Sequence, residues 1–202
     1  LLRKSLQVAK RVLEELFPFF FFFCYAMRKL QEAANPDIGA SDGEYSRYHD
    51  LNSKTLSLRI KEEHERAKAI DEKTVKFTFS ISIALTMLGA TGGYFTTALQ
   101  SGVFKFVVSG VAGTSVFYTL MGGLLALGAL KTFPTYGYGT DFLLSARKNK
   151  QAKVRALAAQ EKINIVRQMR NEAAYQCLRN GFFALLISAT VFVIALSLVP
   201  KD

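Results

Sequence analysis

The sequence has few of the residue types from which enzyme sites and covalent cross-links are built. Its 202 residues include two histidines and two cysteines. Neither type has the spacing of a metal site, and two cysteines far apart in the chain make no disulfide framework. Gly89–Gly93 and the pair Gly122-Gly123 lie inside apolar runs rather than between a strand and a helix, so they form no phosphate-binding loop. We therefore expect a chain that is not an enzyme and that needs no cofactor or metal.

Charge is nearly absent from three long apolar runs, Phe77–Leu99, Val103–Leu130 and Gly181–Val199. The first two runs contain one charged residue between them, Lys105, and the third contains none. Each run reaches the ~20 residues that a helix needs to cross a hydrocarbon core of ~30 Å. A soluble domain of this length rarely hides three such helices, because its surface must stay polar. The lack of buried charge also argues against a proton pump or a charge-coupled transporter.

A shorter apolar segment, Leu16–Met27, lies near the N-terminus. Six of the seven residues from Phe17 to Phe23 are phenylalanine, and the seventh is Pro18. The twelve residues of the segment would make about 18 Å of helix, which is short for a membrane crossing. The segment is compatible with a short or partial span, a re-entrant turn, or an aromatic segment at the membrane interface. We interpret it as a short or partial span, and thus as a possible fourth crossing.

The polar parts of the sequence predict two amphipathic helices. Turn formers between Pro36 and Gly43 precede the first, and Ser41 to Glu44 has the spacing of a capping box. The apolar stripe of the helix 44–76 is Leu56, Ile60, Ala67, Ile70 and Phe77, and that of the helix 142–180 is Val154, Ala158, Ile165, Met169 and Ala173. We assign the charged residues, Glu63, Lys162 and Arg167 among them, to the other faces. No Gly or Pro interrupts either helix, so each is expected to continue into a span.

Together these patterns predict an all-α integral membrane protein of five segments. They are an N-terminal helix with the short or partial span (1–34), a cytoplasmic connection with an amphipathic helix (35–76), a transmembrane hairpin (77–130), a basic cytoplasmic helix (131–180) and a last transmembrane helix (181–202). Small residues four apart let helix backbones approach closely in lipid. On this ground the residues expected at helix–helix contacts are Gly89, Gly93, Ser109, Gly113, Gly122 and Ala126.

The distribution of basic residues predicts the orientation. Residues 131–180 contain ten Lys/Arg and three Asp/Glu, which is most of the formal net charge of +10. The positive-inside rule places this segment in the cytoplasm, or its organellar equivalent, and the segment 28–76 on the same side. A basic helix attracts either nucleic acid or anionic lipid headgroups. We expect headgroups, and no nucleic acid, because the segment is joined directly to a span at each end.

Two charged junctions mark the places where the amphipathic helices enter the membrane. Their residues are Asp71, Glu72 and Lys73 before the first long run, and Arg170, Arg179 and Asn180 before the last. Both junctions lie at one membrane face in the predicted orientation. The pattern is compatible with ion pairs that join Asp71 or Glu72 to Arg179 or Arg170. Such pairs would serve either as ordinary interfacial anchors or as parts of a switch.

In its junctions and its short hairpin loop the chain resembles small prokaryotic transmembrane effectors of antiviral defence, the SLATT-type and related proteins. The resemblance rests on Glu65-Arg66 through Lys76 and on Arg170 to Asn180. It implies a homo-oligomer in the bacterial inner membrane that senses a cue or a cytoplasmic protein partner and disturbs the membrane. The competing interpretation is a structural accessory subunit of a larger complex, for example in an organellar inner membrane. Such subunits are also short, basic and helical.

Overall fold

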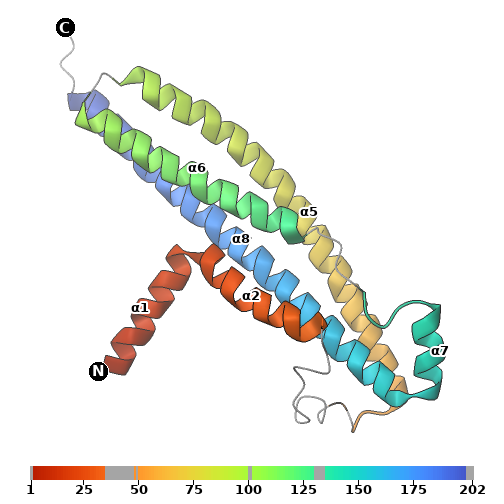
Figure 1. Cartoon of the computed structure of the whole chain (residues 1–202). Coiled ribbons are helices and arrows are strands. Elements are labelled where there is room, and N and C mark those ends of the chain that lie inside the picture. Colours follow the sequence, from red (N-terminus) through yellow and green to blue (C-terminus); the bar gives the residue numbers. More distant parts are fainter. Residues whose placement is uncertain (1, 35–47, 49, 100–101, 130–134, 199–202) are drawn as a thin grey trace. The chain divides into compact units, whose positions relative to one another are not determined.

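The computed structural model describes residues 2–34, 48, 50–99, 102–129 and 135–198, and within these ranges it contains helices and no strands. The helices are α1 (Leu2–Leu16), α2 (Pro18–Ala34), α5 (Ser53–Ala98), α6 (Val103–Ala129), α7 (Thr140–Lys148) and α8 (Lys150–Leu198) (Figure 1). Three of them, α5, α6 and α8, are long and apolar enough to cross a membrane. The predicted all-helical class and the three helices of spanning length are thus confirmed. A fourth crossing stays a prediction.

The chain divides into two compact units. Leu1–Phe21, Lys76–Gly128 and Asn171–Asp202 form one, which we call the apolar unit, and Phe22–Val75 and Ala129–Arg170 form the other, the polar unit. The helices α5 and α8 each contribute residues to both. On α5 the division falls within the predicted junction, directly after Val75. On α8 it falls after Arg170, the first residue of the second junction.

The helix α5 begins at Ser53, later than predicted. Asn52 is its N-cap, since its Oδ1 accepts a hydrogen bond of 2.8 Å from the Thr55 backbone N–H. Residues 50–52 are not helical, so the predicted helix 44–76 is wrong at these positions. The capping box at Ser41 to Glu44 lies outside the described residues.

The predicted helix 142–180 is also interrupted, at Asn149. This residue adopts an extended conformation (φ −138°, ψ 112°) between α7 and α8. Its N–H donates to the Ser145 carbonyl at 2.9 Å, and its Oδ1 accepts from the Gln151 N–H at 2.8 Å. The amide side chain thereby replaces a helical hydrogen bond, as Asn does at helix starts. A hydrophobicity pattern cannot reveal this break, because Asn149 lies between charged residues in a polar stretch and is as polar as they are.

A third break divides the predicted N-terminal segment into two helices. α1 ends at Leu16 and α2 begins at Pro18. Proline fits the first position of a helix, because the N–H that it lacks would have no helical partner there. The backbone N–H of Phe17 still donates to the Leu13 carbonyl at 2.8 Å, which closes the end of α1. Five of the six phenylalanines, residues 19–23, therefore belong to the first turns of α2.

In the apolar unit, α5, α6 and α8 share one core (Figure 1). The rings of Phe95 and Phe192 stack with their centroids 4.5 Å apart. Val108 lies beside them, and its carbonyl accepts a 3.0 Å hydrogen bond from the Ser188 hydroxyl. Because lipid tails are as apolar as these side chains, close packing and such interhelical hydrogen bonds hold helices together in a bilayer.

The six predicted packing residues fall into three groups, which are buried, half-buried and exposed. Gly122 and Ala126 are buried, and a Cβ added at Gly122 would lie 3.0 Å from the carbonyl oxygen of Ala174 on α8. Ser109 is half-buried. Gly89, Gly93 and Gly113 are exposed, and an added Cβ would meet no atom within 4 Å in a single chain. For these three residues the contact stays a prediction, which only a neighbouring chain would satisfy.

Candidate functional site

The helix α5 buries a stripe of residues whose spacing alternates between three and four. The buried or half-buried members are Leu56, Ile60, Glu63, Ala67, Ile70, Thr74, Phe77, Ile81, Ala84 and Leu88. This is the seven-residue repeat of helices that pack along their length. The sequence analysis found most of its polar-unit members but assigned Glu63 to a solvent-facing side. That assignment is wrong, because Glu63 lies on the stripe between Ile60 and Ala67 and is buried.

The helix α8 buries a stripe with the same alternation. Its buried or half-buried members include Asn164, Arg167, Asn171, Ala174, Leu178, Gly181, Leu185, Ser188, Phe192 and Ala195. The predicted stripe was correct at Val154, Ala158 and Ala173, whereas Ile165 is exposed. Lys162 and Arg167, assigned to the outer faces, are buried. Ala158 and Ile165 directly follow the fully buried Leu157 and Asn164, so the predicted stripe is displaced there by one residue from the most deeply buried positions.

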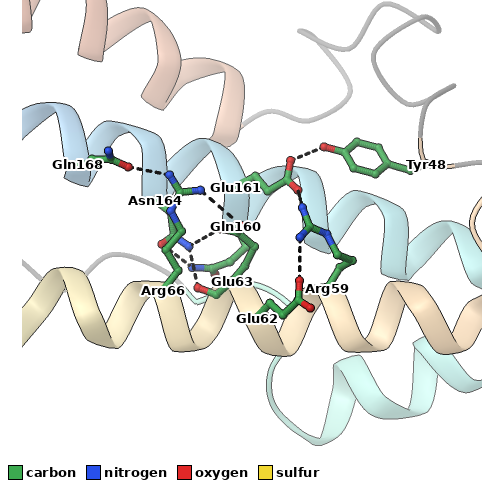
Figure 2. Close-up of polar contacts among 9 residues, drawn as sticks. All are labelled: Tyr48, Arg59, Glu62, Glu63, Arg66, Gln160, Glu161, Asn164 and Gln168. Atoms are coloured by element: carbon green, nitrogen blue, oxygen red, sulfur yellow. Dashed lines mark hydrogen bonds and ion pairs between the residues drawn. The ribbon is translucent and has the colours of Figure 1, made fainter.

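In the polar unit the two stripes meet through a buried amide and a buried carboxylate (Figure 2). Asn164 of α8 donates from Nδ2 to both the carbonyl oxygen and Oε2 of Glu63 on α5, each at 2.8 Å. Asn164 is fully buried and Glu63 is 5% exposed. A buried carboxylate is costly unless hydrogen bonds replace its water, and Asn164 supplies one of these. The contact also fixes which residues of α5 and α8 lie opposite each other.

Further amides and a histidine extend this network to the segment before α7. Gln160 donates from Nε2 to the Asn164 Oδ1 at 3.2 Å, and its Oε1 accepts from the Tyr136 backbone N–H at 2.9 Å. The His64 Nε2 lies 2.8 Å from the Tyr136 carbonyl oxygen. The buried amides of Gln160 and Asn164 thus find hydrogen-bond partners both within α8 and on other elements. The network ties α5, α8 and the chain around Tyr136 into one body.

Ion pairs flank the network along both helices (Figure 2). Arg66 of α5 donates to the Gln168 Oε1 at 2.7 Å and lies 3.5 Å from the Glu63 Oε1. Arg59 pairs with Glu62 at 2.7 Å and reaches Glu161 of α8 at 3.8 Å. Tyr48 donates to the Glu161 carboxylate. Near Arg59 and Glu161, an apolar cluster packs between α5 and α8. It includes Leu56, Ile60, Val154 and Leu157.

At the other end of the network, Asp71 of α5 pairs with Arg167 of α8. Burial lowers the pKa of the Arg167 guanidinium, because desolvation disfavours its charged form. Asp71 offsets that cost with an opposite charge. Both residues line a cleft of about 480 Å³ to which Lys61, His64 and Lys68 also contribute. The cleft thus combines cationic and anionic groups beside the buried network.

The predicted junction residues lie in different surroundings. Glu72 and Lys73 are exposed, and the ion pair of Asp71 is with Arg167, one turn before Arg170 on α8. The Arg170 guanidinium lies 5.2 Å above the ring of Phe22 in α2.

In the apolar unit, Arg179 and Asn180 contact α1. Arg179 pairs with the Glu15 carboxylate, and Asn180 donates to the Glu15 carbonyl at 2.7 Å. The sequence analysis did not foresee this role for α1, because it treated the first residues only as the flank of the phenylalanine run.

The arrangement in the polar unit is suited to holding two helices in one register. Among the residues that the structure describes, no three His, Cys, Asp or Glu side chains gather closely enough to hold a metal ion. No family model matches the chain, and no curated protein or solved structure was found to be similar to it.

We expect Asn164→Leu to lower the stability of the polar unit far more than Gln168→Leu. The first change leaves the buried Glu63 Oε2 without the donor that Asn164 supplies, and an unsatisfied buried polar group costs about 1–3 kcal/mol, more when it is charged. The second removes an exposed partner of Arg66, whose guanidinium can turn to water. Hydrogen exchange of the α5 and α8 amides in detergent measures the difference. Equal protection in both variants would contradict the register-setting role of Asn164.

Proposed function

We propose that this chain is a non-enzymatic, homo-oligomeric membrane sensor and effector. In this proposal the polar unit lies in the cytoplasm and receives a cue, and the three long helices of the apolar unit respond by altering the integrity of the membrane. The proposed context is antiviral defence in the bacterial inner membrane, on the strength of the resemblance of its junctions to SLATT-type effectors. Anionic lipids and a cytoplasmic protein are the proposed partners.

The observation that supports the proposal is the continuity of α5 and α8. Each helix contributes to both units without a break in its hydrogen bonding. No Gly or Pro occurs in α5 from Ser53 to Leu88 or in α8 from Lys150 to Asn180. Sharp bends in helices arise at such residues or at inserted groups. The buried stripe of each helix keeps its alternating spacing over the same stretch. A rotation or shift of these helices in the polar unit would therefore be carried along the same helices into the apolar unit.

The polar contacts supply a reason for two discrete states. A contact between α5 and α8 built only from apolar residues would be more stable and would tolerate several registers. A buried polar pair, by contrast, selects one register. Here the buried pair of Glu63 with Asn164 makes that selection, and the partly exposed ion pair of Asp71 with Arg167 adds to it. A cue that competes for Arg167 or Asp71 in the cleft would weaken the selected register. The spans would then be free to adopt another packing.

The test combines the mass of the assembly with the membrane potential of cells that produce it. The full chain, purified in mild detergent, should run as an oligomer of itself alone, and its overproduction should depolarise the inner membrane as read by a potential-sensitive dye. The matched control is Asn164→Leu in the same vector. This variant should change the extent of depolarisation while the amount of protein in the membrane stays the same. A single copy bound to other proteins, with an unchanged potential, would overturn the proposal in favour of an accessory subunit.

A further inference from the structure

The helix α1 has one apolar face that none of the other residues described by the structure covers. Its exposed apolar residues with described side chains are Val8, Val12, Leu13 and Leu16, and its exposed polar residues are Gln7, Lys10, Arg11 and Glu15. At 3.6 residues per turn, the apolar set occupies one side of the helix and the polar set the other. Val8 and Val12 are 61% and 51% exposed, so the face lacks a partner in the part of the chain that the structure describes.

The charge of this helix identifies the kind of surface that would cover its apolar face. Residues 1–16 contain four Lys/Arg and two Glu. The two Glu are already engaged, Glu14 with Lys10 at 3.7 Å and Glu15 with Arg179. A helix with a wide apolar face and a mainly basic opposite face is suited to the plane of an anionic bilayer, where its apolar side enters the acyl boundary. Long basic side chains at its edges can then reach the headgroups.

Contacts within the apolar unit place the end of α1 at a defined level of α8. Arg179 and Asn180, which hold Glu15, directly precede the uncharged run that begins at Gly181. The Tyr118 hydroxyl of α6 also donates to the Leu16 carbonyl at 2.6 Å. Polar side chains that directly precede an uncharged run belong to the membrane–water interface. The C-terminal end of α1 is thus fixed where α8 passes from polar to apolar surroundings.

We propose that α1 lies in the plane of an anionic lipid surface, with Val8, Val12 and Leu16 toward the acyl chains and Lys10 and Arg11 toward the headgroups. This inference rests on the membrane assignment of α8 and not on the sensor and effector role. Proline at the start of α2 suits such an arrangement, because it ends α1 at the interface. The exposed rings of Phe17 and Phe20 continue the apolar surface beyond that point. The ion pair of Glu15 with Arg179 fastens this in-plane helix to α8.

Spin labels on the full chain test this arrangement. The background is Cys24→Ser, with Cys177 left in place because it is fully buried and takes no label in the folded chain. Single cysteines replace Val12 or Leu16 on one face and Gln7 or Arg11 on the other. Each protein is reconstituted into vesicles of phosphatidylcholine with phosphatidylglycerol. Collision of the label with oxygen reports acyl surroundings, and collision with a water-soluble nickel complex reports exposure to water.

We expect labels at Val12 and Leu16 to collide several-fold more with oxygen than with the nickel complex, and labels at Gln7 and Arg11 to show the reverse. Strong collision with nickel at all four positions would overturn the proposal by placing α1 in water. Labels at Val12 and Leu16 that are shielded from both reagents would overturn it in favour of a protein partner, a second copy included. The double change Lys10→Glu and Arg11→Glu should raise the nickel collisions at Val12 in these vesicles. An unchanged value would exclude anionic headgroups as the attracting surface.

Discussion

Two glycines in place of Glu72 and Lys73 are expected to abolish depolarisation by the chain, whereas two alanines at the same positions should leave it intact. Both side chains are exposed, so neither change removes a buried contact. Glycine is about 1 kcal/mol less favourable than alanine at each helical site, so the pair weakens α5 locally where the polar unit ends. Thr74 is unsuitable for this purpose, because it is buried and its hydroxyl donates to the Ile70 carbonyl at 2.7 Å.

The measurement is the dye-reported potential of cells producing each variant, with the amount in the membrane and the native mass checked in parallel. The glycine variant should insert and assemble as the alanine variant does. Depolarisation by the glycine variant at the wild-type level would show that α5 does not carry the signal. Loss of assembly in both variants would instead show that the exposed charges themselves are needed between chains.

Gly181→Val is expected to cause the largest loss of stability in the apolar unit. A Cβ at this position would lie 2.6 Å from the Thr119 hydroxyl and 3.1 Å from the Ser115 carbonyl oxygen, both on α6. The same glycine accepts a 2.6 Å hydrogen bond from the Ser115 hydroxyl through its own carbonyl. Overfilling a packed site costs about 1–3 kcal/mol, and separation of the helices would also lengthen this hydrogen bond. The control is Gly110→Val on α6, where an added Cβ meets nothing within 4 Å.

Thermal unfolding in detergent can be followed through Cys177, which is fully buried and becomes reactive toward a maleimide dye as the helices separate. The background is Cys24→Ser, because Cys24 is exposed and would react at once. The midpoint for Gly181→Val should fall well below that of wild type, and the midpoint for Gly110→Val should stay near it. Equal midpoints for the two valine variants would contradict the close approach of α6 and α8 at this site.

The three helices of spanning length could be predicted from the sequence because their signal is local. About twenty uncharged residues in a row satisfy all their backbone groups as a helix, whatever their neighbours are. The breaks at Asn52, Phe17 and Asn149 were harder to foresee. They depend on which hydrogen bond a side chain or a proline allows at one position. Hydrophobicity averaged over a stretch of residues does not register the effect of a single position.

The sequence by itself determined the helical class, the three helices of spanning length and the concentration of basic residues in 131–180. Only the tertiary structure decided that Glu63 and Arg167 are buried, that Asn164 and Asp71 are their partners, and that Glu15 meets Arg179. Hydrophobicity is a property of each residue. The tolerance for a buried charge depends on the group opposite it, and that group lies about a hundred or more positions away along the chain. A residue's burial therefore follows from which helices pair and in which register.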